Sequence, residues 1–155
     1  MKEISNNQLR EKAAKIKWFF CDIDGTLTDG GVYYSPEGEL LKRFSLRDGT
    51  GFFLLRQCGI KTGFITTENS LIVEQRAKKL KIDMYIYGTH HKIEAMNGFI
   101  ESEGLSMDEV AYIGDELNDI KLLKACGLSF AVGDADHRVK DSVDIICEKV
   151  GGHGA

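Results

Sequence analysis

Residues 16–26 read IKWFFCDIDGT, and this stretch decides the fold. Its first six residues form a bulky, nearly continuous apolar run, which is typical of a strand buried on both faces of a parallel sheet. The run ends in Asp22 and Asp24, and Gly25 after them can form a sharp turn. The stretch therefore predicts a buried first strand with two carboxylates at its carboxyl end.

Apolar runs of strand length alternate with segments of helical period along the rest of the chain. We expect further strands at residues 61–66, 84–87, 110–114, 128–132 and 143–147, and helices near residues 49–58, 70–80, 91–104 and 117–125. Residues 32–44 break this alternation, because a Pro-x-Gly turn between two short strand-like runs predicts a hairpin. Residues 6–15 have only weak helical period. The pattern predicts one α/β domain over residues 1–155, with a mostly parallel sheet flanked by helices.

The composition excludes several classes of protein. With 20 Lys plus Arg against 24 Asp plus Glu, the formal net charge is −4, which is unsuited to binding nucleic acid or an anionic membrane surface. No apolar run approaches the roughly 20 residues of a membrane helix, and the polar N-terminus lacks the apolar stretch of a signal peptide. The four cysteines contain no C-x-x-C pair, which favours reduced thiols. We therefore expect a cytoplasmic protein with no nucleic-acid or membrane partner.

Polar side chains follow several of the predicted strands. The first strand ends in Asp22 and Asp24, the second in Thr66, and the fourth in Asp115, with Asp119 one helical turn later. Ligands of an open parallel sheet collect outside the carboxyl ends of its strands. Carboxylates crowded at one place repel, so a proton or a cation must lie between them. Hard oxygen ligands without neighbouring His or Cys predict Mg²⁺.

Lys92, near the start of a predicted helix, is the nearby cation. Its ammonium and the hydroxyl of Thr66 can together stabilise the oxygens of a phosphoryl group in transfer. One carboxylate after the first strand can then act as nucleophile and the other as general acid and base. The residues favour phosphoryl transfer through an aspartyl-phosphate.

The motifs DxDGT at residues 22–26, Thr66, Lys92 and GDxxxD at residues 114–119 resemble, in this order, those of the haloacid dehalogenase superfamily. The resemblance covers residues 16–154 and implies a Rossmann-like core. It implies that Asp22 is the nucleophile and that Asp24 protonates the leaving oxygen and then activates water. It also implies Mg²⁺ bound by the Asp22 carboxylate, the main-chain carbonyl of Asp24 and the Asp115 carboxylate.

The same resemblance gives roles to three further residues. Thr66 and Lys92 would hold the phosphoryl oxygens. Asp119 would support either the metal or Lys92 without contacting the phosphoryl group itself.

The spacing leaves no room for a cap domain, since residues 27–65 hold only the hairpin and one helix. A site without a cap is open to water, whereas phosphoryl transfer benefits from enclosure, so we expect another subunit to cover it. This capless form resembles the homotetrameric phosphatases of 3-deoxy-ulosonic acid phosphates. They act on 3-deoxy-D-manno-octulosonate 8-phosphate (KDO 8-phosphate), on the route to lipopolysaccharide, or on the 9-phosphates of nine-carbon sugars such as KDN and N-acylneuraminate (sialic acid).

Residues after the second strand bear on the choice between the two sugars. The octulosonate phosphatases often read Thr-Gly-Arg there, whereas this chain reads Thr66-Thr67-Glu68. Glu68, with Arg76 and Lys79 on the following helix, is more similar to the nonulosonate branch, because Glu68 can accept sugar hydroxyls while a cation pairs with the substrate carboxylate. Thr67 departs from both patterns, so both substrates stay open. We expect Thr67, Glu68, Arg76 and Lys79 to bind substrate; an ordinary charged helix face is the alternative for the last three.

Other functions also fit parts of the pattern. A response-regulator receiver domain would need an acid after the third strand, where this chain has Gly88. A non-catalytic module, similar to those fused to some cytidylyltransferases, would not need the intact acid and lysine set. A phosphatase of another small metabolite is a further alternative. In the family a C-terminal helix follows the GGxGA segment, residues 151–155 here, so we expect either a more open site or a truncated chain.

Overall fold

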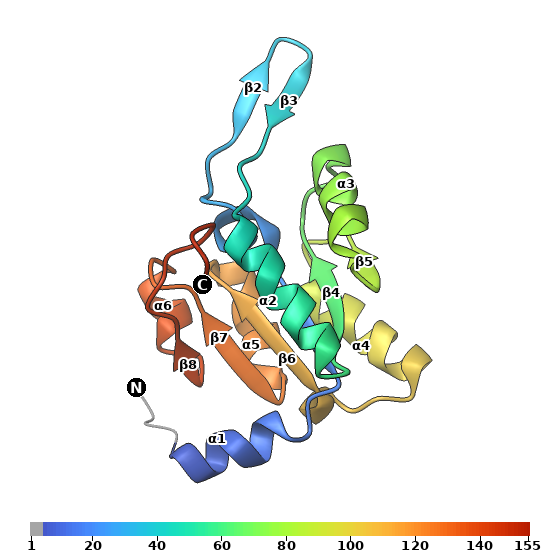
Figure 1. Ribbon diagram of the computed structural model, residues 1–155, viewed down its shortest axis with the longest axis vertical. Coiled ribbons are helices and arrows are strands. Elements are labelled where there is room, and N and C mark those ends of the chain that lie inside the picture. Colours follow the sequence, from blue (N-terminus) through green and yellow to red (C-terminus); the bar gives the residue numbers. More distant parts are fainter. Residues whose placement is uncertain (1–4) are drawn as a thin grey trace.

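The computed structural model describes residues 5–155, and its central element is a six-stranded parallel sheet. The strands are β1 (Trp18–Cys21), β4 (Lys61–Ile65), β5 (Met84–Ile86), β6 (Val110–Gly114), β7 (Leu128–Ala131) and β8 (Ile145–Ile146). Their order is β5-β4-β1-β6-β7-β8 (Figure 1). The predicted fold class, a mostly parallel sheet with a hairpin after the first strand, is confirmed.

Helices cover both faces of the sheet (Figure 1). They are α1 (Asn6–Ala13), α2 (Leu46–Gln57), α3 (Leu71–Leu80), α4 (Lys92–Glu103), α5 (Ile120–Ala125) and α6 (His137–Lys140). In Figure 1, α2 lies in front of the sheet beside α3, and α4 lies behind it against α5. This arrangement explains the apolar character of the strands, because both faces of the sheet are buried.

The first strand lies at the centre of the sheet, between β4 and β6. Its Phe20 is fully buried and stacks on Trp18 at a centroid distance of 5.5 Å, and both rings meet the edge of Phe99 from α4. Burying large aromatic side chains contributes much of the stability of a core of this size. The continuous apolar run therefore forms the centre of the core, and it fixes where the chain emerges with Asp22.

Several element boundaries differ from the predicted ones. Helix α2 begins at Leu46 rather than near residue 49, because the side chain of Ser45 accepts a hydrogen bond from Arg47 N and caps the helix. The weakly periodic leading segment forms α1, which Ser5 and Gln8 cap reciprocally. The four-residue α6 was not predicted, because so short a segment has no readable period.

The predicted hairpin consists of β2 (Tyr33–Ser35) and β3 (Gly38–Leu41), paired antiparallel. It projects beyond the carboxyl edge of the sheet (Figure 1), and a bridge between Thr28 and Phe44 closes its base. Its apolar side chains are exposed: Tyr34 is 72% and Leu40 59% accessible. In the described part of the chain, no helix has the length and apolarity needed to cross a membrane.

Candidate active site

The turn after β1 brings the strand ends together. The chain leaves the sheet at Asp22 and turns sharply, with a hydrogen bond of 2.9 Å from Thr28 N to Ile23 O. Gly25 has φ +87°, and a Cβ atom there would lie 2.1 Å from Oδ2 of Asp115. Only glycine allows both the backbone conformation and this close approach. The turn therefore places the first-strand aspartates against the loop that follows β6.

Three buried carboxylates meet at this edge of the sheet. Oxygens of Asp22, Asp115 and Asp119 lie within 4.8 Å of one another. Burial, and after it the negative charge of Asp119, raises the pKa of Asp22 to about 8. Burial also raises the pKa of Asp115 to about 6, against the opposing effect of a 2.6 Å hydrogen bond from Thr26 Oγ1. Ionised carboxylates this close together repel one another, and a divalent cation between them would remove the repulsion. Because Mg²⁺ prefers oxygen ligands, this set of carboxylates fits Mg²⁺.

Lys92 lies against two of these carboxylates. Its Nζ is 2.7 Å from Oδ1 of Asp22 and 2.6 Å from Oδ1 of Asp119, and the side chain is 1% exposed. Burial alone would lower the pKa of Lys92, but the two carboxylates outweigh burial and the net shift is upward. Lys92 is therefore a fixed buried ammonium beside the carboxylate of Asp22.

Asp119 holds Lys92 in place. Beside the ammonium, Oδ1 of Asp119 accepts a hydrogen bond from the hydroxyl of Tyr112, and Oδ2 accepts the main-chain N–H groups of Asp115 and Glu116, each at 3.1 Å. Both oxygens of Asp119 are thus engaged by the protein. Of the two roles that the sequence left open, support of Lys92 fits this geometry better than support of the metal. The hydrogen bond from Tyr112 to Asp119 was not predicted from the sequence, because a tyrosine within a buried strand is normally interpreted as a core residue.

Asp24 lies at the same edge and contacts a residue that sequence reasoning missed. Its Oδ1 is 2.5 Å from Nζ of Lys42, which is also 2.8 Å from Oε1 of Glu39. The side chain of Asp24 is 29% exposed, although its Oδ2 is buried. The signal for Lys42 was weak, since a lysine in a polar hairpin normally lies in solvent.

Thr66 directly follows β4 and is fully buried. Its hydroxyl accepts a hydrogen bond of 3.2 Å from Glu68 N, which shapes the loop after the strand. In this loop Thr67 is half-buried and Glu68 is exposed. The loop therefore extends from the sheet edge into solvent, with a free carboxylate at Glu68.

Arg76 and Lys79 lie elsewhere. Arg76 is buried, donates to the main-chain oxygen of Ser45 at 2.9 Å, and holds its guanidinium 5.2 Å from the Phe44 ring centre. Lys79 is exposed and lines the same groove between α2 and α3 as Arg76. The structure does not bring these two cations to Asp22 of the same chain.

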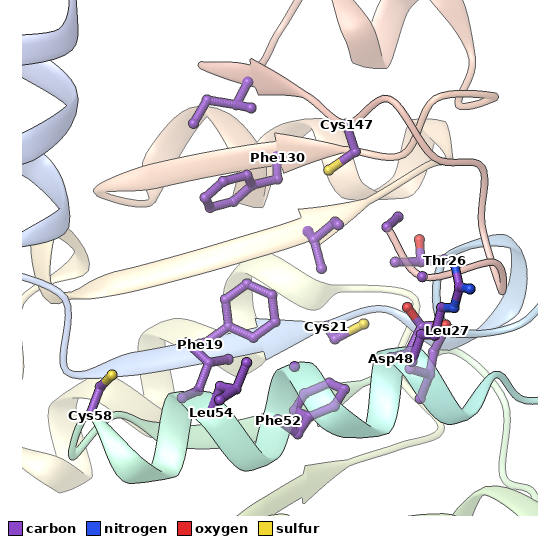
Figure 2. Close-up of a pocket in the computed structure, with 17 residues that line it drawn as sticks. Phe19, Cys21, Thr26, Leu27, Asp48, Phe52, Leu54, Cys58, Phe130 and Cys147 are labelled. Carbon is purple, nitrogen blue, oxygen red and sulfur yellow. The ribbon is translucent and has the colours of Figure 1, made fainter.

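A separate apolar cavity of about 490 Å³ lies between the sheet and α2 (Figure 2). Phe19 and Phe130 project into it from the sheet, and Phe52 and Leu54 face it from α2. Its lining does not include Asp22, Asp24, Lys92 or Asp115. Because the clustered carboxylates and Lys92 lie outside this lining, the cavity is not the predicted phosphoryl site.

Gly151 and Gly152 cover the turn after β1. Gly152 N donates to Thr26 O at 3.0 Å, and Gly151 N donates to the Asp134 side chain at 2.9 Å. A Cβ atom at Gly151 would lie 1.8 Å from Gly25 O, so the two backbones touch. The glycine pair is required by this contact between distant parts of the chain.

Comparison with known proteins agrees with this geometry. The model of the haloacid dehalogenase-like hydrolases matches residues 59–154. The KDO 8-phosphate phosphatase KdsC of Haemophilus influenzae is 36% identical over 147 residues, which is 95% of this chain and 82% of that protein. The Escherichia coli K12 enzyme of the same name is 35% identical over 93% of this chain and 77% of its own. This chain belongs to the haloacid dehalogenase-like hydrolases.

Two solved structures of similar phosphatases contain bound metal ions. The KDO 8-phosphate phosphatase of Moraxella catarrhalis, in complex with a magnesium ion, phosphate and KDO, superposes with a TM-score of 0.93 at 37% identity, over 97% of this chain and 87% of that one. The cobalt-bound Haemophilus influenzae phosphatase gives a TM-score of 0.89 at 37% identity, over 93% of this chain and 84% of that one. This hydrolase is therefore a phosphatase of the haloacid dehalogenase type with Mg²⁺ as its cofactor, as the motifs predicted.

Proposed function

We propose that this phosphatase hydrolyses the phosphate ester of a 3-deoxy-2-ulosonic acid through an aspartyl-phosphate intermediate. One observation carries the mechanism: the Asp22 carboxylate is buried at the end of the central strand, 2.7 Å from the Lys92 ammonium and beside two further carboxylates. An anionic phosphoryl group can approach a carboxylate only where cations offset the repulsion. The identity to KDO 8-phosphate phosphatases supports the substrate class.

The proposed steps use residues already placed. An oxygen of Asp22 attacks phosphorus, the bond from phosphorus to the ester oxygen breaks, and Asp24 gives its proton to the leaving sugar oxygen. Asp24 then takes a proton from water, which attacks the phosphorus of the aspartyl-phosphate and releases phosphate and free Asp22. Thr66 and Lys92 hold the phosphoryl oxygens during both steps.

The metal site in this proposal consists of the Asp22 carboxylate, the main-chain carbonyl of Asp24 and the Asp115 carboxylate. When bound, Mg²⁺ offsets the charge of the phosphoryl oxygens. Asp115 is ready for this role because Thr26 fixes one of its oxygens at 2.6 Å. Asp119 supports the site through Lys92, as its contacts indicate.

The substrate is either KDO 8-phosphate or a KDN or N-acylneuraminate 9-phosphate. The relatives favour the first, whereas Glu68 in place of the expected arginine favours the second. Glu68 is exposed, and its carboxylate can accept hydrogen bonds from sugar hydroxyls, with Thr67 beside it. Because Arg76 and Lys79 lie in a groove apart from Asp22, they would bind substrate only in the site of a neighbouring subunit.

We further propose a cytoplasmic homotetramer in which the hairpin is a subunit contact. The exposed apolar side chains of the hairpin and the adjoining helices support this, since such a patch marks an interface. They are Val32, Tyr33, Tyr34, Leu40, Leu41, Leu46 and Leu71. All four cysteines are free, which suits a reducing compartment.

The function is tested by phosphate release from KDO 8-phosphate, KDN 9-phosphate, N-acylneuraminate 9-phosphate and p-nitrophenyl phosphate, with Mg²⁺ and with EDTA. We expect turnover of at least one sugar acid phosphate in Mg²⁺ and none in EDTA, because the crowded carboxylates need the cation. Turnover of p-nitrophenyl phosphate alone would point to another small phosphorylated metabolite. Failure on every ester would favour a non-catalytic module.

Glu68→Ala should change the choice among the sugars more than it changes aryl phosphate turnover. Losing hydrogen bonds to a charged acceptor should raise KM for the preferred sugar about 10-fold or more. Hydrolysis of p-nitrophenyl phosphate, which has no sugar hydroxyls, should stay near the wild-type rate. Glu101→Ala, at an exposed position on α4, is the matched control. Equal losses of activity on the sugar and aryl esters would show that Glu68 does not determine substrate specificity.

A further inference from the structure

The base of the hairpin contains a buried ammonium that the reaction as proposed does not use. The side chain of Lys42, just after β3, is 1% exposed. Its Nζ lies 2.5 Å from Oδ1 of Asp24 and 2.8 Å from Oε1 of Glu39. The other oxygen of Glu39 accepts a hydrogen bond from Ser70, in the loop after β4. Four side chains thus connect Asp24, the hairpin and this loop.

Lys42 engages only one of the two oxygens of Asp24. Within residues 5–155, Oδ2 of Asp24 is buried and has no hydrogen-bond partner. Buried polar atoms are nearly always paired, and an unpaired one at a reaction site calls for an explanation. An oxygen that must exchange a proton with a substrate needs to be free of protein partners in the resting site. The asymmetry fits a carboxyl group that is held at Oδ1 and reacts at Oδ2.

Lys42 is held between two carboxylates, one of Asp24 and one of Glu39. A lysine with three donors and two carboxylate partners has a fixed direction, unlike a solvated one. Removing it would let the carboxylate of Asp24 rotate in its 29% exposed position.

We propose that Lys42 is a positioning residue for proton transfer: it holds Oδ1 of Asp24 and leaves Oδ2 without a protein partner, for the proton that is exchanged with the ester oxygen of the substrate. This inference rests on the proposed function, because it assigns Asp24 the part of general acid and base. It adds that the hairpin contributes a charged group to the reaction and not only an apolar surface. It also makes the position of Asp24 depend on Glu39 and Ser70.

Two esters with different leaving groups can distinguish this role of Lys42 from a purely structural one. Expulsion of a sugar alkoxide needs a proton, whereas p-nitrophenolate leaves without one, so a misplaced acid affects kcat/KM of the two esters unequally. Lys42→Met should lower kcat/KM for the preferred sugar phosphate on the order of 100-fold, and that for p-nitrophenyl phosphate only a few-fold. Adding Lys42→Met to Asp24→Asn should cause no further loss on the sugar ester, because the partner is already absent.

Controls keep the outcomes distinct. Lys17→Met removes an exposed ion pair to Glu109 before β1 and should leave both esters at wild-type rates. Thermal unfolding checks that Lys42→Met is folded; if it is not, Lys42→Gln keeps a donor for Oδ1 and should show a smaller loss of the same selective kind. Equal losses on both esters in a folded variant would overturn the role of Lys42 and leave the proposed function intact. A wild-type protein inactive on both esters would overturn the two together.

Discussion

Asp22→Asn should abolish phosphate release while leaving the fold intact. Removal of a nucleophile costs on the order of 10⁴-fold or more in turnover. We expect no gain of one phosphate in mass when the variant is mixed with substrate and Mg²⁺ and quenched in acid, whereas the wild type should show it. Measurable turnover above 1% of wild type would refute the assignment of Asp22.

The same substitution should not destabilise the metal-free protein. The pKa of Asp22 is raised from 3.8 to about 8, so between these values the folded protein retains a proton that the unfolded chain releases. Stability from this group is therefore lost as pH rises from about 4 to 8, and neutral Asn removes that loss. At pH 7 in EDTA the variant should melt at or above the wild-type temperature, and Asp108→Asn, at an exposed position, should match the wild type. A large drop for Asp22→Asn would mean that the ionised carboxylate supports the fold.

Lys92→Met should damage both stability and catalysis. Without the ammonium, the carboxylate of Asp119 is left buried without its cation, which lowers the free energy of unfolding by about 3–5 kcal/mol. The loss of a fixed positive group beside the phosphoryl oxygens should lower kcat about 10²–10³-fold. Urea denaturation and phosphate release measure the two effects.

A surface lysine provides the comparison for Lys92. Lys78→Met breaks an exposed ion pair with Glu74 on α3 and should change stability by less than about 0.5 kcal/mol. If Lys92→Met were as mild as Lys78→Met, Lys92 would not be the buried cation of this site. If Lys92→Met were strongly destabilised but kept full kcat, Lys92 would stabilise the fold without contributing to catalysis.

Local features of the sequence predicted the sheet and the polar side chains at its carboxyl edge. The apolar run before Asp22 could only be a buried strand, and parallel strands bring their carboxyl ends to one edge. For this reason Asp22, Asp24, Thr66 and Asp115 could be placed at one edge of the sheet without any knowledge of the fold, and their catalytic roles stay predictions. The single domain over residues 1–155 stays a prediction.

Features that depend on distant contacts were not predictable. Lys42 is buried because it meets Asp24, 18 residues away, and its own neighbours in the chain give no sign of this. Arg76 reads as a cation on a helix face, but folding places it under Phe44 and against Ser45 O. The difference arises because periodicity reports which face of an element is apolar, whereas ion pairs depend on how elements meet.

The contact of Gly151 and Gly152 with the turn that follows Asp22 has a consequence for biosynthesis. On the ribosome, the nucleophile emerges well before the glycine pair that covers its loop. A nascent chain halted before residue 151 would hold every acid and still lack this cover. We therefore expect a nascent chain to gain activity only after Gly151 and Gly152 have left the ribosome.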